Sequence, residues 1–223
     1  MAKDYIAIID YGSGNLRSAA KAFEHVVNSA GLPFDVKLVS AAHELDAASH
    51  IVLPGQGAFG DCMAGLKAVD GMINALEENI RARKKPFLGI CVGMQLLADR
   101  GLEHGEHAGL GWISGDVVPL KFSEQPTDKS LKIPHMGWNT LDKIHDHFVL
   151  RGIECEGDSA DHYYFVHSFM FECKEGKHIL ATSEYGGAVT AIVGEENIIG
   201  VQFHPEKSQK AGLHLLRNFV DMK

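Results

Sequence analysis

The chain has 223 residues, of which 45% are hydrophobic and 22% charged, which is enough apolar material for one large domain over residues 1–223. Its formal net charge of -8 argues against a nucleic-acid backbone or an anionic membrane surface as partner, although one local site could still hold a small phosphorylated ligand. The four cysteines have no C-x-x-C spacing, and we expect them to be reduced thiols. The segment 1–10 lacks the pattern of a signal peptide, and the uncharged run at 86–98 is too short to cross a bilayer, so we expect a cytoplasmic protein.

The first hundred residues alternate between strand-like and helix-like patterns. The predicted elements are a strand at 5–9, a helix at 16–29, strands at 34–39 and 50–53, a helical stretch at 58–83 with a break near 70–71, and a strand at 87–90. This β-α-β-β-α-β order predicts a parallel sheet with right-handed crossovers and helices against its faces. The loop at 10–15 contains two glycines, but Arg17 stands where a third would be, so a dinucleotide fingerprint is absent.

After Asp99 the pattern changes to short, β-prone segments that are rich in glycine. They lie at 109–120, 132–144, 163–173, 179–183, 188–193 and 198–201. We expect them to form hairpins or a meander that continues the same sheet. An exposed loop is expected at 122–130, and an amphipathic helix over about 210–222 follows the last strand.

Cys91 lies in the pattern Gly89-Ile-Cys-Val-Gly93, between an apolar strand and a helix-like stretch that runs to Asp99. This is the arrangement of a nucleophile elbow, with sulfur in place of the usual serine oxygen. Glycines allow a tight turn there, and the unpaired N–H groups at a helix start favour a thiolate. A buried cysteine in a core strand explains the isolated motif about as well.

A second candidate group is the sequence His204-Pro-Glu206 near the end of the last predicted strand. Pro205 disfavours a helical conformation at His204. In an extended chain, positions i and i+2 point the same way, roughly 6–7 Å apart, so Glu206 could hydrogen-bond one ring nitrogen of His204. With Cys91 these residues would form a nucleophile, a base and an orienting group. The alternative is a solvent-exposed His–Glu pair at the end of a strand. The H-x-E pattern also occurs in zinc deaminases, but the P-C-x-x-C sequence that accompanies it there is absent. No other His or Cys spacing predicts a metal site.

Six ordered motifs extend across almost the whole chain. They are Asp10-Tyr-Gly-Ser-Gly-Asn-Leu16, Pro54-Gly-Gln-Gly-Ala-Phe59, Gly89-Ile-Cys-Val-Gly-Met-Gln-Leu96, Pro134-His-Met-Gly-Trp-Asn139, Tyr164-Phe-Val-His-Ser168 and Gln202-Phe-His-Pro-Glu-Lys-Ser208. An elbow cysteine with a downstream His-Pro-Glu resembles the triad, or class I, glutamine amidotransferases. The full set resembles the glutaminase subunits of imidazole glycerol phosphate synthase.

This resemblance implies an α/β fold of three layers, αβα, with a mixed, mostly parallel central sheet. It also implies that the chain hydrolyses L-glutamine to glutamate and ammonia and passes the ammonia to a cyclase subunit, a (β/α)₈ barrel, for imidazole glycerol phosphate formation in histidine biosynthesis. The implied partners are glutamine and the cyclase subunit in a heterodimer. Neither a cofactor nor a metal ion is implied.

The resemblance also assigns catalytic roles. Cys91 would attack the side-chain amide of glutamine, and His204, held by Glu206, would protonate the departing ammonia and later activate water against the thioester. The backbone N–H groups of Val92, the first residue of its helix, and of Gln56, between two glycines, would receive the negative charge of the tetrahedral intermediate.

Substrate and partner contacts follow from the same resemblance. Substrate contacts are expected at Gly55, Gln95, His167, Ser168 and Phe169, and partner contacts at Asn15, Met136, Trp138 and Lys207, within a partner face that includes 134–139. Gln95 follows Cys91 by four residues, so one helical face presents both. Without the resemblance, the simpler interpretations are an ordinary turn at 54–57, core side chains at 136, 138 and 167, and a solvated lysine at 207.

Three positions depart from the family pattern. Gln56 stands in place of a small apolar residue, Val92 in place of Leu and Phe169 in place of Tyr. The first two would act through the backbone, so the chemistry should be retained, whereas loss of the tyrosine hydroxyl leaves substrate affinity and gating open. Two other enzymes stay open, a glutaminase that serves another acceptor, such as a pyridoxal phosphate synthase subunit, and a stand-alone cysteine hydrolase. An inactive scaffold is disfavoured because all three triad positions are filled.

Overall fold

The computed structural model describes residues 4–122, 131–155 and 157–223. Except for Phe122, the loop predicted at 122–130 lies outside them. The central sheet has eight strands in the spatial order β2 (Asp35–Val39), β1 (Tyr5–Ile9), β3 (Ala48–Gly55), β4 (Phe87–Cys91), β14 (Ile198–Val201), β13 (Ala188–Glu195), β12 (Ile179–Glu184) and β9 (Asp142–Lys143). Neighbours from β2 to β14 are parallel, and the remaining pairs are antiparallel.

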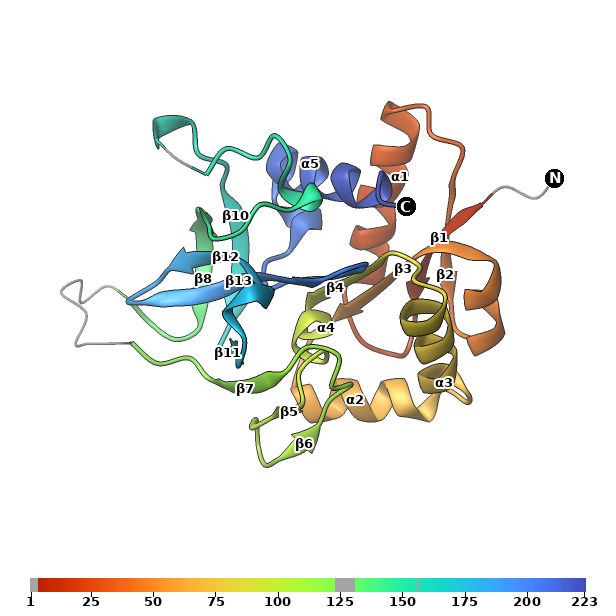
Figure 1. The fold of residues 1–223 in the computed structure, drawn as a ribbon, viewed down its shortest axis with the longest axis horizontal. Helices are drawn as coiled ribbons and strands as arrows, with labels where there is room; N and C mark the ends of the chain where they lie inside the picture. The colour runs from red at the N-terminus through yellow and green to blue at the C-terminus, as the bar shows by residue number, and fades with distance from the viewer. Residues whose placement is uncertain (1–3, 123–130, 156) are drawn as a thin grey trace.

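Helices cover both faces of this sheet. They are α1 (Leu16–Ser29), α2 (Phe59–Ala68), α3 (Met72–Leu76), α4 (Val92–Gln95) and α5 (Gln209–Val220). α1 and α5 lie on one face, and α2, α3 and α4 lie on the other (Figure 1). The predicted α/β fold of three layers, αβα, with a mixed, mostly parallel central sheet is confirmed. The predicted break in the second helix is also confirmed, because Gly71 has a φ of 70° between α2 and α3.

Two smaller sheets lie beside the antiparallel half. One pairs β8 (His135–Asn139) with β10 (Tyr163–His167), and the other has the order β11 (Phe169–Cys173), β7 (Gly115–Pro119), β5 (Arg100–Gly101) and β6 (His107–Ala108). The expectation that every segment after Asp99 continues the main sheet is therefore wrong for much of the region before β12. The division falls at Ser168, between β10 and β11, where the Leu120 N–H donates to the Ser168 carbonyl (2.8 Å).

The helix after Cys91 is shorter than predicted. α4 ends at Gln95 because the next carbonyl groups accept hydrogen bonds from a distant loop instead of from the next helical turn. Leu110 N–H donates to the Leu96 carbonyl (2.8 Å), and Trp112 N–H donates to the Leu97 carbonyl (2.9 Å). Short 3₁₀ turns occupy Ala42–Ala47, Phe148–Leu150, Gly157–Ser159, Gly176–His178 and Pro205–Lys207, and a π-helical segment occupies Glu77–Ala82.

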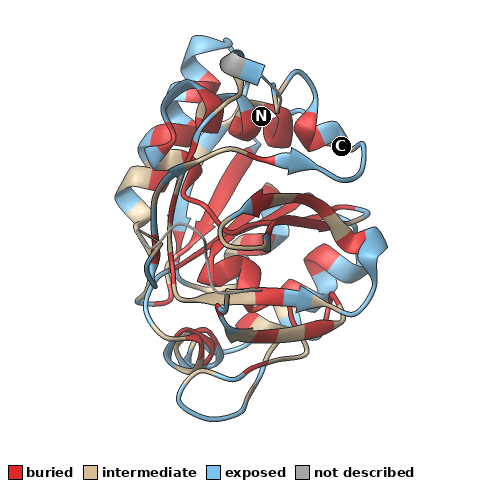
Figure 2. Cartoon of the chain, turned by 90° about the vertical axis from the view of Figure 1, so that its left-hand side faces the viewer, coloured by how far each residue is buried: buried red, intermediate tan, exposed pale blue. Residues whose placement is uncertain are grey.

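The buried side chains form one hydrophobic cluster with members from β1 to α5. All residues of β1, β4 and α4 are buried, whereas α1, α2 and α5 have both buried and exposed residues (Figure 2). In α1 the buried residues recur every three to four positions, as at Ala19, Phe23 and Val26. Among the described residues, no helix combines the length and the apolar character needed to span a membrane.

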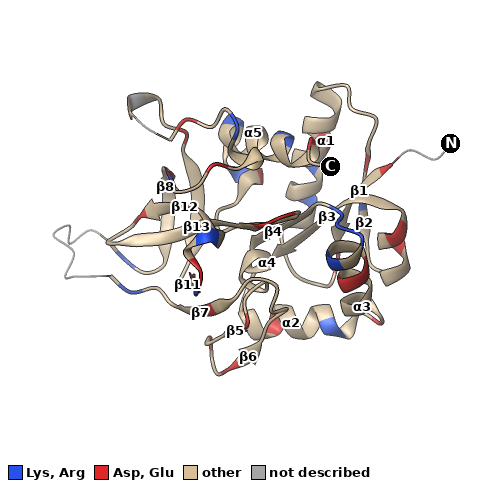
Figure 3. Ribbon diagram, in the orientation of Figure 1, with Lys and Arg blue, Asp and Glu red and all other residues tan. Residues whose placement is uncertain are grey.

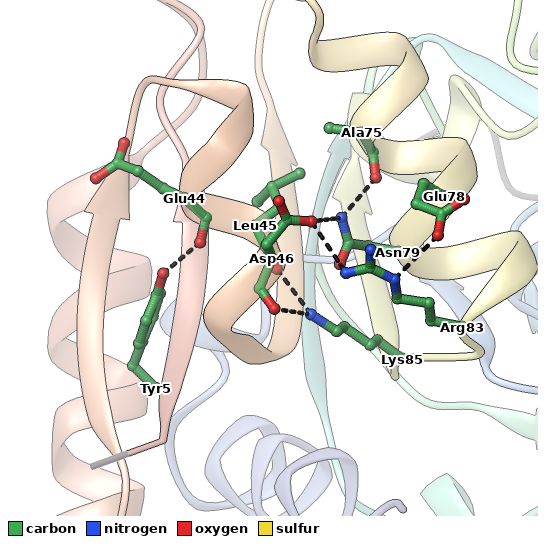
Figure 4. Close-up of polar contacts among 9 residues, drawn as sticks. All are labelled: Tyr5, Glu44, Leu45, Asp46, Ala75, Glu78, Asn79, Arg83 and Lys85. Atoms are coloured by element: carbon green, nitrogen blue, oxygen red, sulfur yellow. Dashed lines mark hydrogen bonds and ion pairs between the residues drawn. The ribbon is translucent and has the colours of Figure 1, made fainter. Parts of the chain in front are cut away.

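Polar contacts fix the beginning of β4 (Figure 4). Lys85 donates from Nζ to the carbonyl oxygens of Leu45 (2.9 Å) and Asp46 (2.8 Å). The Asp46 carboxylate accepts from Arg83 (3.0 Å) and Asn79 (3.2 Å). The segment just before β4 is therefore held by side chains, and β4 itself pairs with a strand along each edge. Across the described chain, acidic and basic residues are interspersed over helices, strands and loops (Figure 3).

Candidate active site

Cys91 lies at the junction of β4 and α4, where the backbone turns sharply. Its φ of 55° is in the left-handed region, which is uncommon for a residue with a side chain. A Cβ at Gly93 would lie 1.8 Å from the Leu53 carbonyl oxygen, and one at Gly89 would lie 2.5 Å from the Gly93 carbonyl oxygen. The tight turn predicted from the Gly-x-Cys-x-Gly pattern is confirmed, and the geometry is that of a nucleophile elbow.

His204 reaches Cys91 because β14 is the neighbour of β4 in the central sheet. The two strands are parallel and Val201 pairs with Ile90, so the residues that follow both strands emerge at the same edge. The His204 and Cys91 side chains line the same pocket and lie close enough to interact electrostatically. The sheet therefore brings together two side chains that lie more than a hundred positions apart in the sequence.

Glu206 orients His204. Oε1 of Glu206 lies 2.9 Å from Nδ1 of His204, and both side chains are almost fully buried. His204 is extended, as predicted, but Glu206 does not reach back along an extended strand. Residues 205–207 form a 3₁₀ turn, closed by the Lys207 N–H on the His204 carbonyl (3.0 Å), and this turn brings the carboxylate to the ring. The contact is confirmed, and its predicted geometric cause is corrected.

The charge of His204 is set by its two neighbours. Burial alone lowers its pKa, but the hydrogen bonds and charge interactions with Cys91 and Glu206 outweigh burial and raise the pKa to about 9. The ring therefore holds a proton at neutral pH. Because Nδ1 faces Glu206, the other ring nitrogen, Nε2, is left for the contact with Cys91.

The second carboxylate oxygen of Glu206, Oε2, is buried, and no hydrogen-bond donor among the described residues reaches it. Next to it is a cavity of about 10 Å³, lined by Asn15, Pro54 and Gly55 as well as by His204 and Glu206. This is about the volume that one water molecule needs. Asn15, expected at the partner face, and Gly55, expected at the substrate, thus lie behind the triad.

A pocket of about 300 Å³ opens in front of Cys91, at the lower end of the range for small-molecule sites. The expected site residues that line it are Gln56, Cys91, Val92, Gln95, His167, Ser168, Phe169, His204 and Lys207. Gly57, Glu103 and Val166 also line it and were not predicted: Gly57 and Val166 lie within two of the six motifs but had no role of their own, and Glu103 lies in none. Met136 and Trp138 lie outside the pocket on β8, with 60% and 48% of their surfaces exposed.

Gln202 is a buried residue of the site that the motif analysis did not single out. Its side-chain nitrogen donates to the Cys91 sulfur (3.8 Å), and its side-chain oxygen accepts from Gln95 (3.0 Å). Gln95 also donates to the Phe169 carbonyl (3.3 Å). The available signal was the two-residue period of an extended chain, which places Gln202 on the same side as His204. These amides link the nucleophile to the opposite wall of the pocket.

His167 belongs to a chain of hydrogen bonds that runs to β8. Its Nδ1 contacts the Phe169 carbonyl (2.8 Å), and its Nε2 contacts Nδ1 of His135 (3.0 Å). Nδ2 of Asn139 lies 3.4 Å from Nε2 of His135. Since a carbonyl only accepts and an amide nitrogen only donates, the bonds assign Nδ1–H to both neutral rings. Burial lowers the pKa of His135 to about 3 and that of His167 to about 4, so both rings are neutral at pH 7.

The two expected oxyanion donors differ in the structure. Val92 is the first residue of α4, so its N–H has no partner within the helix. The Gln56 N–H donates instead to the hydroxyl of Ser13 (3.2 Å). Elsewhere in 4–122, 131–155 and 157–223, the structure brings together no group of three or more His, Cys, Asp or Glu side chains that could hold a metal ion.

Comparisons with known proteins agree with this geometry. Residues 7–222 match the family model described as glutamine amidotransferase class-I. The chain is 51% identical over 218 residues to imidazole glycerol phosphate synthase subunit HisH of Brucella suis biovar 1 (98% of this chain, 99% of that one), and 52% identical over 215 residues to the protein of that name from Mesorhizobium japonicum (96% and 97%).

Solved structures show the same fold. One is described as a glutamine amidotransferase, with a TM-score of 0.68, 18% identity and coverage of 96% of this chain and 98% of that one. Another is a glutamine amidotransferase from Thermotoga maritima, with a TM-score of 0.66, 17% identity and coverage of 99% and 98%. At such low identity these two structures support the fold alone.

Proposed function

Because the chain belongs to the class I glutamine amidotransferases, and within them to the HisH subunits of imidazole glycerol phosphate synthase, we propose that it hydrolyses glutamine with Cys91, His204 and Glu206. The observation that carries this proposal is the buried contact of His204 with both the elbow cysteine and Glu206 (2.9 Å). The ammonia released would serve imidazole glycerol phosphate formation in histidine biosynthesis.

The reaction would start from the Cys91 thiolate beside a protonated His204, which carries the proton taken from the thiol. The sulfur attacks the side-chain amide carbon of glutamine, and the negative charge on the amide oxygen is stabilised by backbone N–H groups at Val92 and Gln56. His204 gives its proton to the departing nitrogen, ammonia leaves, and a thioester remains on Cys91. The neutral ring then takes a proton from water as the water attacks the thioester. Glutamate leaves, and the sulfur and the protonated ring are regenerated.

The remaining residues position the substrate. Gln95, Ser168 and Phe169 line the pocket, and Gln95 donates to the Phe169 carbonyl; there they would contact the α-amino and carboxylate groups of glutamine. His167, tied to the Phe169 carbonyl, would hold that wall in place rather than take part in proton transfer, because its ring stays neutral at pH 7.

We assign the partner face to β8 and the segment before it. Ile133, Met136 and Trp138 are large apolar residues with about half of their surfaces exposed, and Pro134, between them in sequence, lines the pocket. Lys207 also lines the pocket, with Nζ 5.6 Å from the centroid of the Tyr164 ring on β10. A cyclase subunit docked here would cover the pocket mouth and receive the ammonia.

We take residues 1–223 as one domain that works in the cytoplasm, where its four free cysteines would stay reduced.

The test uses the reconstituted complex with the cyclase. Cys91→Ala should abolish glutamine-dependent cyclisation, a loss of about 10⁴-fold or more, while cyclisation driven by added ammonia continues. Cys155→Ala, a half-buried thiol away from the pocket, is the matched control and should leave both reactions intact. Covalent labelling by a glutamine-like electrophile should fail only in Cys91→Ala. Retention of glutamine-dependent activity without Cys91 contradicts the mechanism, and co-purification with another synthase instead of the cyclase transfers the assignment.

A further inference from the structure

The side chain of Gln202 lies between the nucleophile and Gln95, which lines the pocket. It has no exposed surface (0%), and it comes directly after β14, two residues before His204. Its side-chain nitrogen, Nε2, donates to the Cys91 sulfur (3.8 Å), and its oxygen, Oε1, accepts from Gln95 (3.0 Å). A buried amide costs free energy unless both of its ends are bonded, so these two partners indicate what the residue does.

The carbonyl group of Phe169 fixes the direction of both amides. A carbonyl oxygen only accepts, so the side-chain atom of Gln95 that lies 3.3 Å from it is the nitrogen. The second N–H of this nitrogen meets Gln202 and therefore requires the oxygen of that amide. The nitrogen of Gln202 is then left for the sulfur of Cys91. The chain of bonds thus delivers an N–H group, and not a carbonyl oxygen, to the nucleophile.

The same bonds determine which atom Gln95 offers to a ligand. Both N–H groups of its nitrogen are used, so its oxygen is the remaining polar atom. That oxygen has no partner among the described residues and remains accessible, and Gln95 lines the pocket. An acceptor at this place suits a hydrogen-bond donor of the substrate, and the α-ammonium group of a free amino acid is such a donor.

We propose that Gln202 is a further residue of the catalytic machinery, with one role at each end of its amide. The nitrogen stabilises the thiolate of Cys91, because a donated N–H group favours the charged sulfur over the neutral thiol. The oxygen positions Gln95, because it holds the nitrogen of that residue and so leaves its oxygen for the substrate. The proposal rests on the proposed function, since it takes Cys91 as the nucleophile and Gln95 as a substrate contact.

The experiment uses the complex with the cyclase and the variant Gln202→Met, which keeps the side-chain length and removes the amide. We expect kcat for glutamate release to fall about tenfold and KM for glutamine to rise about tenfold, the factors for one lost hydrogen bond at each end. Cyclisation driven by added ammonia should keep the wild-type rate, which shows that the complex is assembled. Wild-type kcat and KM in this variant overturn the proposal.

A double-mutant cycle with Gln95 separates positioning from a general loss of packing. If Gln202 acts on the substrate through Gln95, Gln202→Met should have no further effect on KM once Gln95→Met has removed that amide. The fall in kcat, which comes from the contact with Cys91, should persist in the double variant. KM effects that multiply in the double variant overturn the positioning role.

The contact with the sulfur has a readout that needs no glutamine. Iodoacetamide reacts with the thiolate, so its reaction with the peptide that contains Cys91, followed by mass spectrometry at several pH values, reports how readily the thiolate forms. In Gln202→Met this rate should reach half of its maximum about one pH unit higher than in the wild type. An unchanged profile overturns the role at the sulfur. A wild-type complex that releases no glutamate contradicts the proposed function instead, and the profile then still decides the contact of Gln202 with Cys91.

Two further variants guard against a loss of structure. Asn218→Leu removes another buried amide, which donates to the carbonyl oxygens of Val149 (3.0 Å) and Arg151 (2.8 Å), and it should change neither the kinetics nor the alkylation profile. If Gln202→Met fails to fold, Gln202→Glu keeps an oxygen for Gln95 and removes the N–H group. KM should then stay within about twofold of the wild type while kcat falls about tenfold. An unchanged kcat in Gln202→Glu overturns the role of the N–H group.

Discussion

The two walls of the pocket are built in different ways. On one side, the triad wall (Cys91, His204 and Glu206) is buried and emerges from adjacent parallel strands in the middle of the central sheet. On the other side, the loop wall (residues 56–57 and 166–169) consists of the exposed turn that follows β3 and the junction between two small sheets. The first wall is assembled before any ligand arrives, whereas the second holds a donor that faces elsewhere. The fold therefore fixes the three side chains of the triad wall, whereas the Gln56 N–H of the loop wall donates to Ser13.

The most severe way to break the triad wall is Gly93→Ala. The new Cβ would lie 1.8 Å from the Leu53 carbonyl oxygen, a backbone atom that cannot move without disturbing β3. We expect a loss of more than about 4 kcal/mol in the free energy of unfolding, beyond the usual range for a point substitution, and little soluble protein. Chemical denaturation measures it. Gly176→Ala, where a Cβ meets nothing within 4 Å, is the control, and equal stability of the two variants would refute the crowding argument.

Glu206→Gln should weaken the triad wall without dismantling it. The amide oxygen can still accept from Nδ1 of His204, but it cannot stabilise the charged ring, so the pKa of His204 falls from about 9. We expect glutaminase kcat to fall roughly 10²–10⁴-fold, as expected when an orienting carboxylate of a triad is lost. The loss of activity at high pH, which follows deprotonation of the ring, should also move to lower pH. A pH–rate profile identical to that of the wild type would contradict the orienting role.

The smallest effect is expected from His135→Phe, on β8 behind the loop wall, where His135 contacts His167. The unfolded chain binds protons on His135 and His167 below about pH 6.5, whereas the folded protein does so only near pH 3 to 4. Stability should therefore fall as the pH falls from 6.5 toward 4. The variant keeps a ring between Tyr185 and Phe165 but removes one of these groups, so this acid-side slope should flatten.

At pH 7 the same variant should lose about 1–3 kcal/mol in the free energy of unfolding, because Nε2 of the buried His167 is left without its donor. His204 has the opposite effect on the free energy of unfolding, because its raised pKa contributes stability below pH 6.5 that is lost as the pH rises through about 9. His135→Phe should leave this loss of stability at high pH unchanged. Urea unfolding at several pH values measures both limbs. His25→Phe, at an exposed position on α1, is the control. If the stability of His135→Phe falls with decreasing pH as steeply as that of the wild type, the role of the histidine pair is contradicted.

The triad wall could be predicted from the sequence because its signals are local. The two glycines around Cys91 indicate a tight turn, and the proline after His204 indicates an extended backbone at His204. Both signals depend only on neighbouring residues. The parallel half of the sheet was predicted for the same reason, since its strands are continuous apolar runs separated by amphipathic helices.

The resemblance predicted most residues of the loop wall, but their contacts could not be predicted, because these join distant segments. Nothing near Ser13 indicates that its hydroxyl will meet Gln56, 43 residues away. The early end of α4 depends on the loop at 110–113, and the division of one β-prone stretch at Ser168 depends on Leu120. Periodicity reports which side of an element is buried, but not which distant backbone groups compete for its hydrogen bonds.

The position of β14 has a consequence for biogenesis. It follows every other described strand in the chain, yet it inserts between β4 and β13. Before β14 is synthesised, the edges of β4 and β13 that it pairs with are unpaired, and unpaired apolar strand edges are prone to aggregation. The same segment delivers His204, so an incomplete translation product can neither close its sheet nor consume glutamine. Catalytic competence and escape from aggregation are thus gained in a single step.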